Sequence, residues 1–152
     1  IGGARPRILV GGSGSPRSYR IAARYADEFN LSSSGPDRAR EAYAAVDAAC
    51  QAIGRDPASL ARSTMAGVLI GGDEADVAER VRALEATLDA PDDRDSWLQE
   101  RLERWITGTP DEARETVRRY AETGVERIML QDLLPWDLDM IDVIGEALVG
   151  QV

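Results

Sequence analysis

The sequence has no histidine and no lysine, and it holds a single cysteine, Cys50. Without histidine, the usual zinc sites and every histidine-dependent catalytic triad are excluded. Without lysine, a Walker phosphate loop and a Schiff-base mechanism are excluded. One cysteine forms no internal disulfide, which is typical of a reducing compartment. We therefore expect a cytoplasmic protein with no metal site, in which Cys50 is a buried structural thiol.

The sequence also lacks long apolar runs and an excess of positive charge. No run approaches the roughly 18 apolar residues that a membrane span requires, and no signal peptide is visible. The net charge of −9 would repel a phosphate backbone or an anionic membrane. We therefore predict a small-molecule substrate as the partner, and neither nucleic acid nor membrane.

Apolar patterns along the chain predict alternating strands and helices. The apolar run at 8–10 predicts a short strand whose two faces are both covered. Capping residues mark helix starts, and the predicted cap residues are Ser34, Asp56, Asp73 and Thr109, with Glu112 completing a capping box after Thr109. This alternation favours an α/β protein with parallel strands and right-handed crossovers. The predicted strands are 8–10, 26–30, 63–70 and 125–131, and the last predicted helix is 135–149.

Several side chains have a plain packing interpretation. Trp97 and Trp105 lie eight residues apart in a predicted helix rich in leucine, which favours core or subunit packing over ligand stacking. The last helix is expected to bury Leu138, Ile141, Ile144 and Leu148. The acidic stretch 89–95 lacks calcium-loop spacing and is predicted to be a solvated loop.

The stretch "ILVGGSGSP", residues 8–16, places three glycines between a strand and a helix. Parallel α/β sheets bind ligands at the carboxyl ends of their strands, where glycine lets a ligand approach the backbone. Gly11, Gly12 and Gly14, followed by the start of a helix at Pro16 and by Arg17, make a candidate phosphate cradle. The dinucleotide fingerprint does not fit, because its third glycine would fall at Arg17. A tight strand-to-helix turn with no ligand is the alternative.

Three stretches carry a resemblance to a known family: "RPRILVGGSGSPRSYRIAARYADEFN", "AIGRDPASLARS" and "GTPDEARETVRRYAETGVERIML". In this order they resemble the bacterial luciferase-like flavin monooxygenases, and most of all the branch that uses the deazaflavin coenzyme F420. The resemblance implies a (β/α)8 TIM barrel that binds F420, or alternatively FMN, at the carboxyl ends of its strands. It implies that Gly11, Gly12, Ser13 and Gly14 offer backbone amides to the coenzyme phosphate, with Arg17 nearby. It also places Asp27 and Asn30 at a strand end near the barrel mouth.

A complete barrel of this kind needs about 250 residues, whereas this chain has 152. The resemblance covers the carboxyl-terminal part of the family, and the chain begins at Ile1 rather than at methionine. We therefore expect residues 1–152 to be a partial luciferase-like barrel domain, a fragment whose amino-terminal half is missing or whose open edges are covered in a homo-oligomer.

Three functions follow from these observations. The first is the coenzyme-phosphate-binding part of an oxidoreductase that carries out hydride transfer or monooxygenation on a small organic substrate. The second is a non-catalytic half-barrel used in assembly or regulation, since no complete catalytic set is visible. The third, a sugar-phosphate barrel of the aldolase or isomerase type, loses support because a Schiff base needs lysine. Gln131 and Asp132, after the last predicted strand, are further positions where a barrel holds functional groups.

Overall fold

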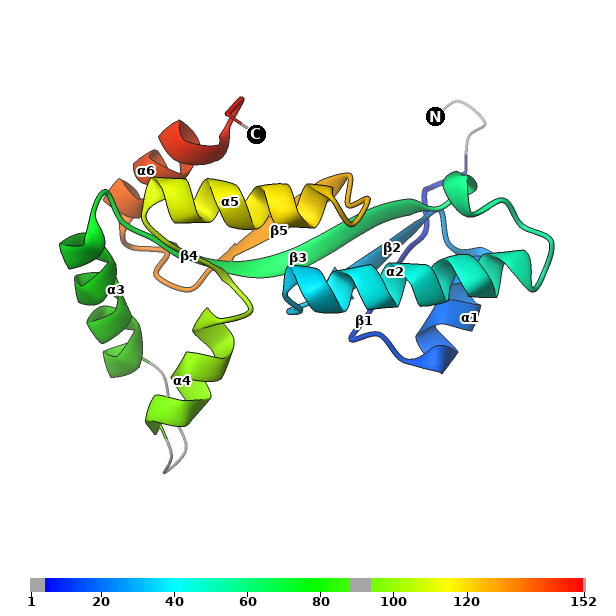
Figure 1. The fold of residues 1–152 in the computed structure, drawn as a ribbon, viewed down its shortest axis with the longest axis horizontal. Helices are drawn as coiled ribbons and strands as arrows, with labels where there is room; N and C mark the ends of the chain where they lie inside the picture. The colour runs from blue at the N-terminus through cyan, green and yellow to red at the C-terminus, as the bar shows by residue number, and fades with distance from the viewer. Residues whose placement is uncertain (1–4, 88–93, 152) are drawn as a thin grey trace.

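The computed structural model describes residues 5–87 and 94–151, and its strands and helices alternate as the sequence predicts (Figure 1). The strands are β1 (Leu9–Gly12), β2 (Glu28–Ser32), β3 (Ala61–Ile70), β4 (Ile106–Gly108) and β5 (Arg127–Asp132). The helices are α1 (Pro16–Tyr25), α2 (Pro36–Gln51), α3 (Glu74–Thr87), α4 (Arg94–Leu102), α5 (Pro110–Ala121) and α6 (Leu138–Leu148), with a 3₁₀ turn, η1, at Pro57–Ser59.

All five strands form one parallel sheet organised around the long strand β3. Along one edge of β3, β2 pairs with residues 61–65 and β4 pairs with residues 68–70. Strand β5 pairs with residues 63–68, so it must lie along the other edge, and β1 pairs with β2. Within the described part of the chain, the outer edges of β1 and β5 have no strand partner. The α/β class with parallel strands is thus confirmed.

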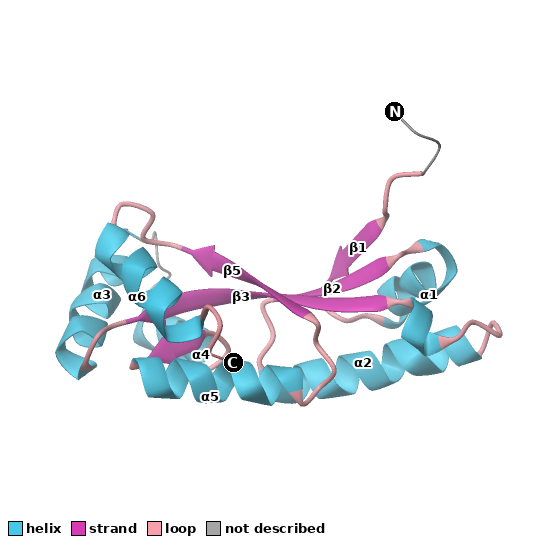
Figure 2. Ribbon diagram, turned by 90° about the horizontal axis from the view of Figure 1, so that it is seen from above, coloured by secondary structure: helices cyan, strands magenta, loops and turns pink. Residues whose placement is uncertain are grey.

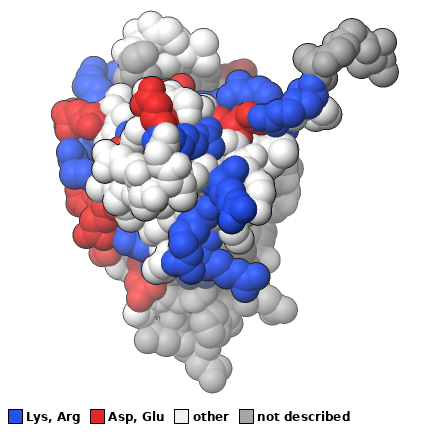
Figure 3. Space-filling model, turned by 90° about the vertical axis from the view of Figure 1, so that its right-hand side faces the viewer, with Lys and Arg blue, Asp and Glu red and all other residues white. Residues whose placement is uncertain are grey.

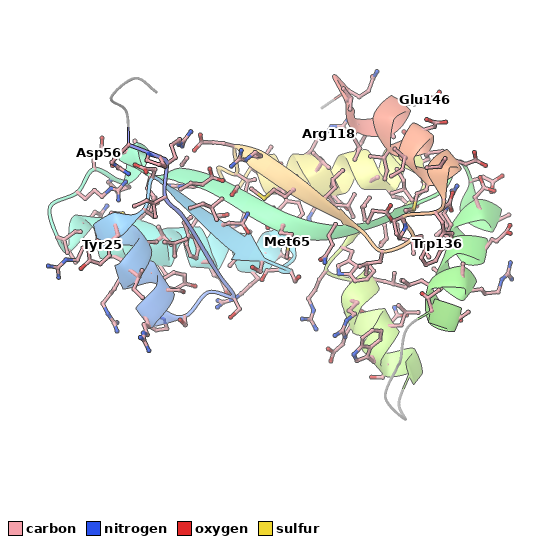
Figure 4. All side chains as sticks on the ribbon, turned by 180° about the vertical axis from the view of Figure 1, so that it is seen from behind. Tyr25, Asp56, Met65, Arg118, Trp136 and Glu146 are labelled. Carbon is pink, nitrogen blue, oxygen red and sulfur yellow. The ribbon has the colours of Figure 1, made fainter. Side chains whose placement is uncertain are left out.

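One face of the sheet is covered by helices, and the opposite face is open over its middle. Figure 2 shows α2 and α5 lying along one side of the sheet. The main core forms on that side, where Phe29, Leu31 and Ile70 are fully buried against the helices. Seen from behind, the middle of the sheet carries no helix among the described elements, and Met65 lies on this open face (Figure 4). The opposite side faces outward over its middle, and its end at Leu69 is covered by a second core that includes Leu84, Trp105 and Met140.

This open face contradicts the prediction that both faces of the first strand are covered. Leu9, which points away from the helix side that Val10 packs against, is 45% exposed. The apolar sequence here is typical of a strand in the interior of a barrel. Here Leu9, at the β1 edge of the open face, has no described second layer to pack against.

Most helix starts agree with the sequence, because capping chemistry is local. The Asp73 carboxylate accepts hydrogen bonds from the backbone N–H groups of Ala75 and Asp76 at 2.8 and 3.0 Å. The Asp56 carboxylate caps η1 in the same way, and Thr109 with Glu112 opens α5. Ser34 is an exception: α2 begins after Gly35, and the Ser34 hydroxyl donates instead to the carbonyl of Ser32.

Other differences lie where tertiary packing decides the structure. The predicted helix through Trp97 and Trp105 ends at Leu102, and a short strand, β4, follows it. In α6, Leu138 and Ile141 are exposed, whereas Met140, Ala147 and Leu148 are buried. Cys50 is buried, as predicted. The acidic segment 89–95 lies largely outside the described residues. No helix in the described ranges has the length and apolar character to cross a membrane.

Candidate functional site

The glycine turn lies where β1 ends and α1 begins, at the carboxyl edge of the sheet. Gly11 and Gly12 are the last residues of β1 and lie opposite Asn30 and Leu31 of β2. Ser13 and Gly14 form the turn, and Ser15 is the N-cap of α1. The structure therefore places the predicted residues at the position where parallel sheets bind ligands.

Two of the glycines are required by the packing of the chain itself. Gly14 has a φ of +87°, and a Cβ there would lie 2.7 Å from the hydroxyl oxygen of Tyr19. A Cβ on Gly12 would lie 3.1 Å from the Cβ of Ser18 in α1. These glycines let the turn reverse and let α1 approach the strand. The structure thus supports the tight-turn interpretation at these two positions.

Gly11 is different, because the chain leaves open space beside it. A Cβ on Gly11 would meet no atom within 4 Å, and its backbone φ is not in the left-handed region. Val10, the preceding residue, packs toward the helices, so Gly11 faces the open side of the sheet. Nothing in the described chain requires glycine at this position. The space beside Gly11 is therefore available to a group from outside the chain.

The backbone amides of the turn are partly free. The Ser15 N–H donates to the Ser18 hydroxyl at 3.0 Å, and the Ser18 N–H donates to the Ser15 hydroxyl at 3.2 Å, which closes the cap of α1. The N–H groups of Ser13 and Gly14 have no acceptor among the described residues. Two adjacent amides without an acceptor, beside the positive end of a ten-residue helix, are donors available to an anion.

Cationic side chains flank the turn on two sides. Arg17, the second residue of α1, is exposed, as are Arg20 and Arg24 on the same helix. Figure 3 shows arginine side chains gathered on the side of the molecule that carries α1. Arg38, from the first turn of α2, donates to the carbonyl of Gly14 at 2.9 Å. No pattern in the sequence pointed to Arg38, because only the pairing of β1 with β2 brings the start of α2 to the glycine turn.

A cavity of about 700 Å³ opens next to Ser13. It lies between the end of β2, the start of α2 and the segment before β4. Its charged lining side chains include Arg38, Arg104 and Arg119, together with Asp37 and Glu103. Arg119 pairs with Asp37 at 3.1 Å, so the charges in this cavity are partly neutralised.

The structure corrects the prediction for Asp27. Asp27 precedes β2, at the amino end of the strand and away from the glycine turn. Its carboxylate accepts hydrogen bonds from the Arg5 guanidinium and from the Ile8 N–H, and the bond from Arg5 is the main reason that its pKa is lowered. Asp27 therefore fixes the segment that enters β1. The "AD…N" pattern alone does not indicate at which end of the strand the aspartate lies.

Asn30 belongs to a buried polar network on the open face of the sheet. Its side-chain amide donates to the Ser63 hydroxyl at 2.9 Å, and the Ser63 hydroxyl donates to Glu28 at 2.5 Å. Arg127 of β5 pairs with the same carboxylate. Burial alone would raise the pKa of Glu28, but the hydrogen bonds from Ser63 and Arg127 outweigh it, and the pKa is lowered. The network joins β2, β3 and β5 near their amino ends, since Glu28 and Arg127 are the first residues of their strands, whereas Asn30 lies in the middle of β2.

Gln131 and Asp132 are the last residues of β5, as the sequence analysis placed them at a strand end. Gln131 is exposed and lines a cavity at this edge. The Asp132 carboxylate accepts a hydrogen bond from the Leu134 N–H at 2.7 Å, so it stabilises the turn that follows. Across the residues that the structure describes, no three side chains from histidine, cysteine, aspartate and glutamate are grouped to hold a metal ion.

The residues at the turn fit a phosphate group. A phosphate carries negative oxygens that accept N–H bonds, and the turn supplies two free amides, a helix start and nearby guanidinium groups. The open space beside Gly11 leaves room for the rest of a bound molecule. Helix α1 contains no acidic residue, whereas Asp37 and Glu103 line the cavity beside Ser13 and Glu41 pairs with Arg38 at 3.0 Å.

Comparison with solved structures shows a recurring fold. The chain is similar to the coenzyme F420-dependent tetrahydromethanopterin reductase of Methanopyrus kandleri, with a TM-score of 0.73 and 15% identity over 95% of this chain and 50% of that one. It is similar to an F420-dependent secondary alcohol dehydrogenase, with a TM-score of 0.71 and 17% identity over 96% and 49%. It is also similar to the EDTA monooxygenase of Chelativorans sp. BNC1, with a TM-score of 0.71 and 20% identity over 96% and 47%.

This chain thus spans about half the length of these three proteins. No curated protein sequence matches it. The model of the luciferase-like monooxygenase family matches residues 2–127, which is most of the chain. The chain belongs to the luciferase-like monooxygenase family, and its parallel α/β fold corresponds to about half of the family's barrel.

Proposed function

We propose that this chain is the coenzyme-phosphate-binding part of a luciferase-like oxidoreductase. The coenzyme is F420, with FMN as the alternative, and the substrate is a small organic molecule. Residues 1–152 form the carboxyl-terminal part of the barrel, in line with the order of the three family-like stretches. The coenzyme, when bound, supplies the redox chemistry, and the protein supplies its position and the neutralisation of its phosphate.

The observation that carries this proposal is the pair of free amides at Ser13 and Gly14. Both lie at the carboxyl end of a parallel strand, beside the open space at Gly11. A turn that served packing alone would need Gly12 and Gly14, but it would not need Gly11. In this proposal Ser13 and Gly14 donate to the phosphate oxygens, while Arg17 and Arg38 lower the electrostatic cost of bringing the anion to the backbone.

The first experiment measures how much of the affinity depends on the phosphate. FMN and riboflavin differ only in the phosphate, so the ratio of their dissociation constants measures its contribution, and F420 is titrated separately. Hydrogen bonds to a charged group contribute about 1.5–3 kcal/mol each, so losing the phosphate is expected to weaken binding by at least tenfold. Flavin and deazaflavin fluorescence titrations of the 152-residue chain give the dissociation constants.

The second experiment fills the space beside the turn with one methyl group. Gly11→Ala meets no clash in the chain, so the variant is expected to fold, and its added methyl lies where the coenzyme approaches. Coenzyme affinity is expected to fall by about tenfold or more. Gly145→Ala is the matched control, because a Cβ at Gly145 also meets nothing within 4 Å and α6 lies away from the turn.

Either of two results would end the proposal. One is the absence of binding of both coenzymes by the chain, which would leave the non-catalytic half-barrel as the better description. The other is equal affinity for the phosphorylated and unphosphorylated forms, together with no effect of Gly11→Ala.

A further inference from the structure

A second cavity, of about 290 Å³, lies between α4 and the carboxyl ends of β2 and β5, and it does not include the glycine turn. Ser33, Gln131 and Leu133 contribute from the strand ends. Two tryptophans and two arginines, from α4 and the segment after it, complete the wall: Trp97, Arg101, Arg104 and Trp105. Its volume is at the small end of the range for ligand pockets.

The wall of this cavity is firmly built. The indole ring of Trp105 lies directly against the backbone of Gly67, where a Cβ would come within 2.4 Å of ring atoms. Only 9% of Trp105 is exposed. The Tyr120 hydroxyl donates to the carbonyl of Ser34 at 2.5 Å and lies 3.4 Å from the carbonyl of Arg104. The strand ends and the segment before β4 are thus tied together behind the cavity.

The charge of the lining is one-sided. It contains two arginines and no aspartate or glutamate, in a chain whose net charge is −9. The Arg101 guanidinium lies 3.6 Å from the centre of the Trp97 ring and donates to the Trp97 carbonyl at 3.2 Å. Within the part of the chain that the structure describes, Arg101 has no carboxylate partner. Arg104, by contrast, pairs with Glu100 at 2.7 Å.

These features define what the cavity accepts. A guanidinium that is stacked on an indole ring is held in orientation, and its remaining N–H groups match a carboxylate in a two-pronged geometry. The apolar surfaces of Trp105 and Leu133 favour an apolar body. The exposed amide of Gln131 can donate one further hydrogen bond.

We propose that this cavity binds a small organic carboxylate with a ring-shaped apolar body, with the carboxylate on Arg101 and the ring against Trp105 and Leu133. The site shares no residue with the glycine turn, although Ser33 and Arg104 also line the cavity beside Ser13, and it is tested without coenzyme. Failure of this proposal leaves the coenzyme site untouched, and the reverse also holds.

Tryptophan fluorescence provides the assay, because two of the three tryptophans line the cavity. The third, Trp136, is 62% exposed and lies on the connection between β5 and α6 (Figure 4), so the Trp136→Phe variant serves as the parent for all measurements. Benzoate is the probe, and benzamide is the neutral control of the same shape. Benzoate is expected to give a saturable change with a dissociation constant of about 1 mM, and benzamide is expected to bind at least tenfold more weakly.

Arg101→Gln is expected to weaken benzoate binding by tenfold or more, since it removes the charge but keeps a polar side chain. Arg82→Gln, at an exposed position on α3, is the matched control and is expected to leave binding unchanged. Thermal unfolding by circular dichroism establishes that each variant is folded. The benzoate and benzamide comparison needs no variant at Arg101 and decides the matter even if Arg101→Gln does not fold. Equal binding of the two probes, no saturable change with benzoate, or full affinity in folded Arg101→Gln would each overturn the proposal.

Discussion

The contact between Gly67 and Trp105 allows a sharp test of the packing around the second cavity. Gly67 is buried in the middle of β3, and a Cβ there would lie 2.4 Å from two atoms of the indole ring and 2.6 Å from a third. Real Cβ atoms essentially never approach other atoms so closely. In Gly67→Ala, either the ring or the strand must therefore move.

The expected cost follows from two opposing effects. A glycine-to-alanine change that fits without strain stabilises a protein by about 0.4–1 kcal/mol through the unfolded state. Overpacking a buried site costs about 1–3 kcal/mol, and the indole of Trp105 is rigid and only 9% exposed. Gly67→Ala is therefore expected to lower the free energy of unfolding by about 1–3 kcal/mol. Gly145→Ala, where nothing lies within 4 Å, is expected to raise it slightly.

Urea unfolding followed by far-UV circular dichroism measures these free energies, since Trp105→Ala removes one of the three tryptophans and so changes the fluorescence signal itself. Trp105→Ala alone is expected to cost about 3–5 kcal/mol, the range for removing a buried large aromatic side chain. In the double variant, the methyl group added at position 67 no longer meets the ring, so the two effects are expected to differ from additivity by about 1–3 kcal/mol. Two results would contradict the packing of Trp105 on Gly67: additive changes in the free energy of unfolding in the double variant, or a Gly67→Ala variant as stable as the parent.

Two further predictions concern ion pairs. Arg80 is 9% exposed, and it bonds the Asp137 carboxylate at 2.8 Å and the Ile70 carbonyl at 3.0 Å. Arg80→Gln is therefore expected to lower the free energy of unfolding by about 2–3 kcal/mol in urea titrations, with exposed Arg82→Gln as control; an equal effect of both variants would contradict this. The pKa of Glu28 is lowered in the folded state, so its stabilising effect is full above the ordinary value of 4.5 and is lost as the pH falls through the lowered value. Urea midpoints measured between about pH 5 and pH 2 should fall less steeply in Glu28→Gln than in the parent, and parallel curves would count against the network.

Local signals explain which parts of the fold the sequence predicts. The carboxylates of Asp73 and Glu112 accept hydrogen bonds from amides within three residues, so the effect of these caps is visible in a short window of sequence. Strand β3 ends in the apolar run 65–70, and its predicted range differs from the observed one only by two residues at the start. The family-like stretches supplied the barrel architecture, which no single window of the sequence determines.

The elements and contacts that the prediction missed depend on distant parts of the chain. Strand β4 has three residues and forms because β3 continues past the end of β2 and leaves an edge to pair with. Contacts of α6 with α5 and β3 decide which of its side chains are buried, so Met140 is buried and Ile141 is exposed. Trp105 was correctly predicted to be buried, but its role as a cavity wall depends on Gly67, which lies 38 residues earlier.

The polar groups of this sheet lie at its two ends and have different roles there. The position of a substitution along the strands should therefore decide whether it affects folding or ligand binding. At the amino ends of the strands, Asp27 and Arg5 satisfy each other, and Glu28 is engaged by Arg127 close by. At the carboxyl ends, some donors can still form hydrogen bonds with a ligand. They are the amides of Ser13 and Gly14 and the guanidinium of Arg101. In random mutagenesis, substitutions that impair folding should cluster at the amino ends of the strands. Substitutions that change ligand affinity should cluster at the carboxyl ends. New specificities should then be obtainable at the carboxyl rim with little loss of folded protein.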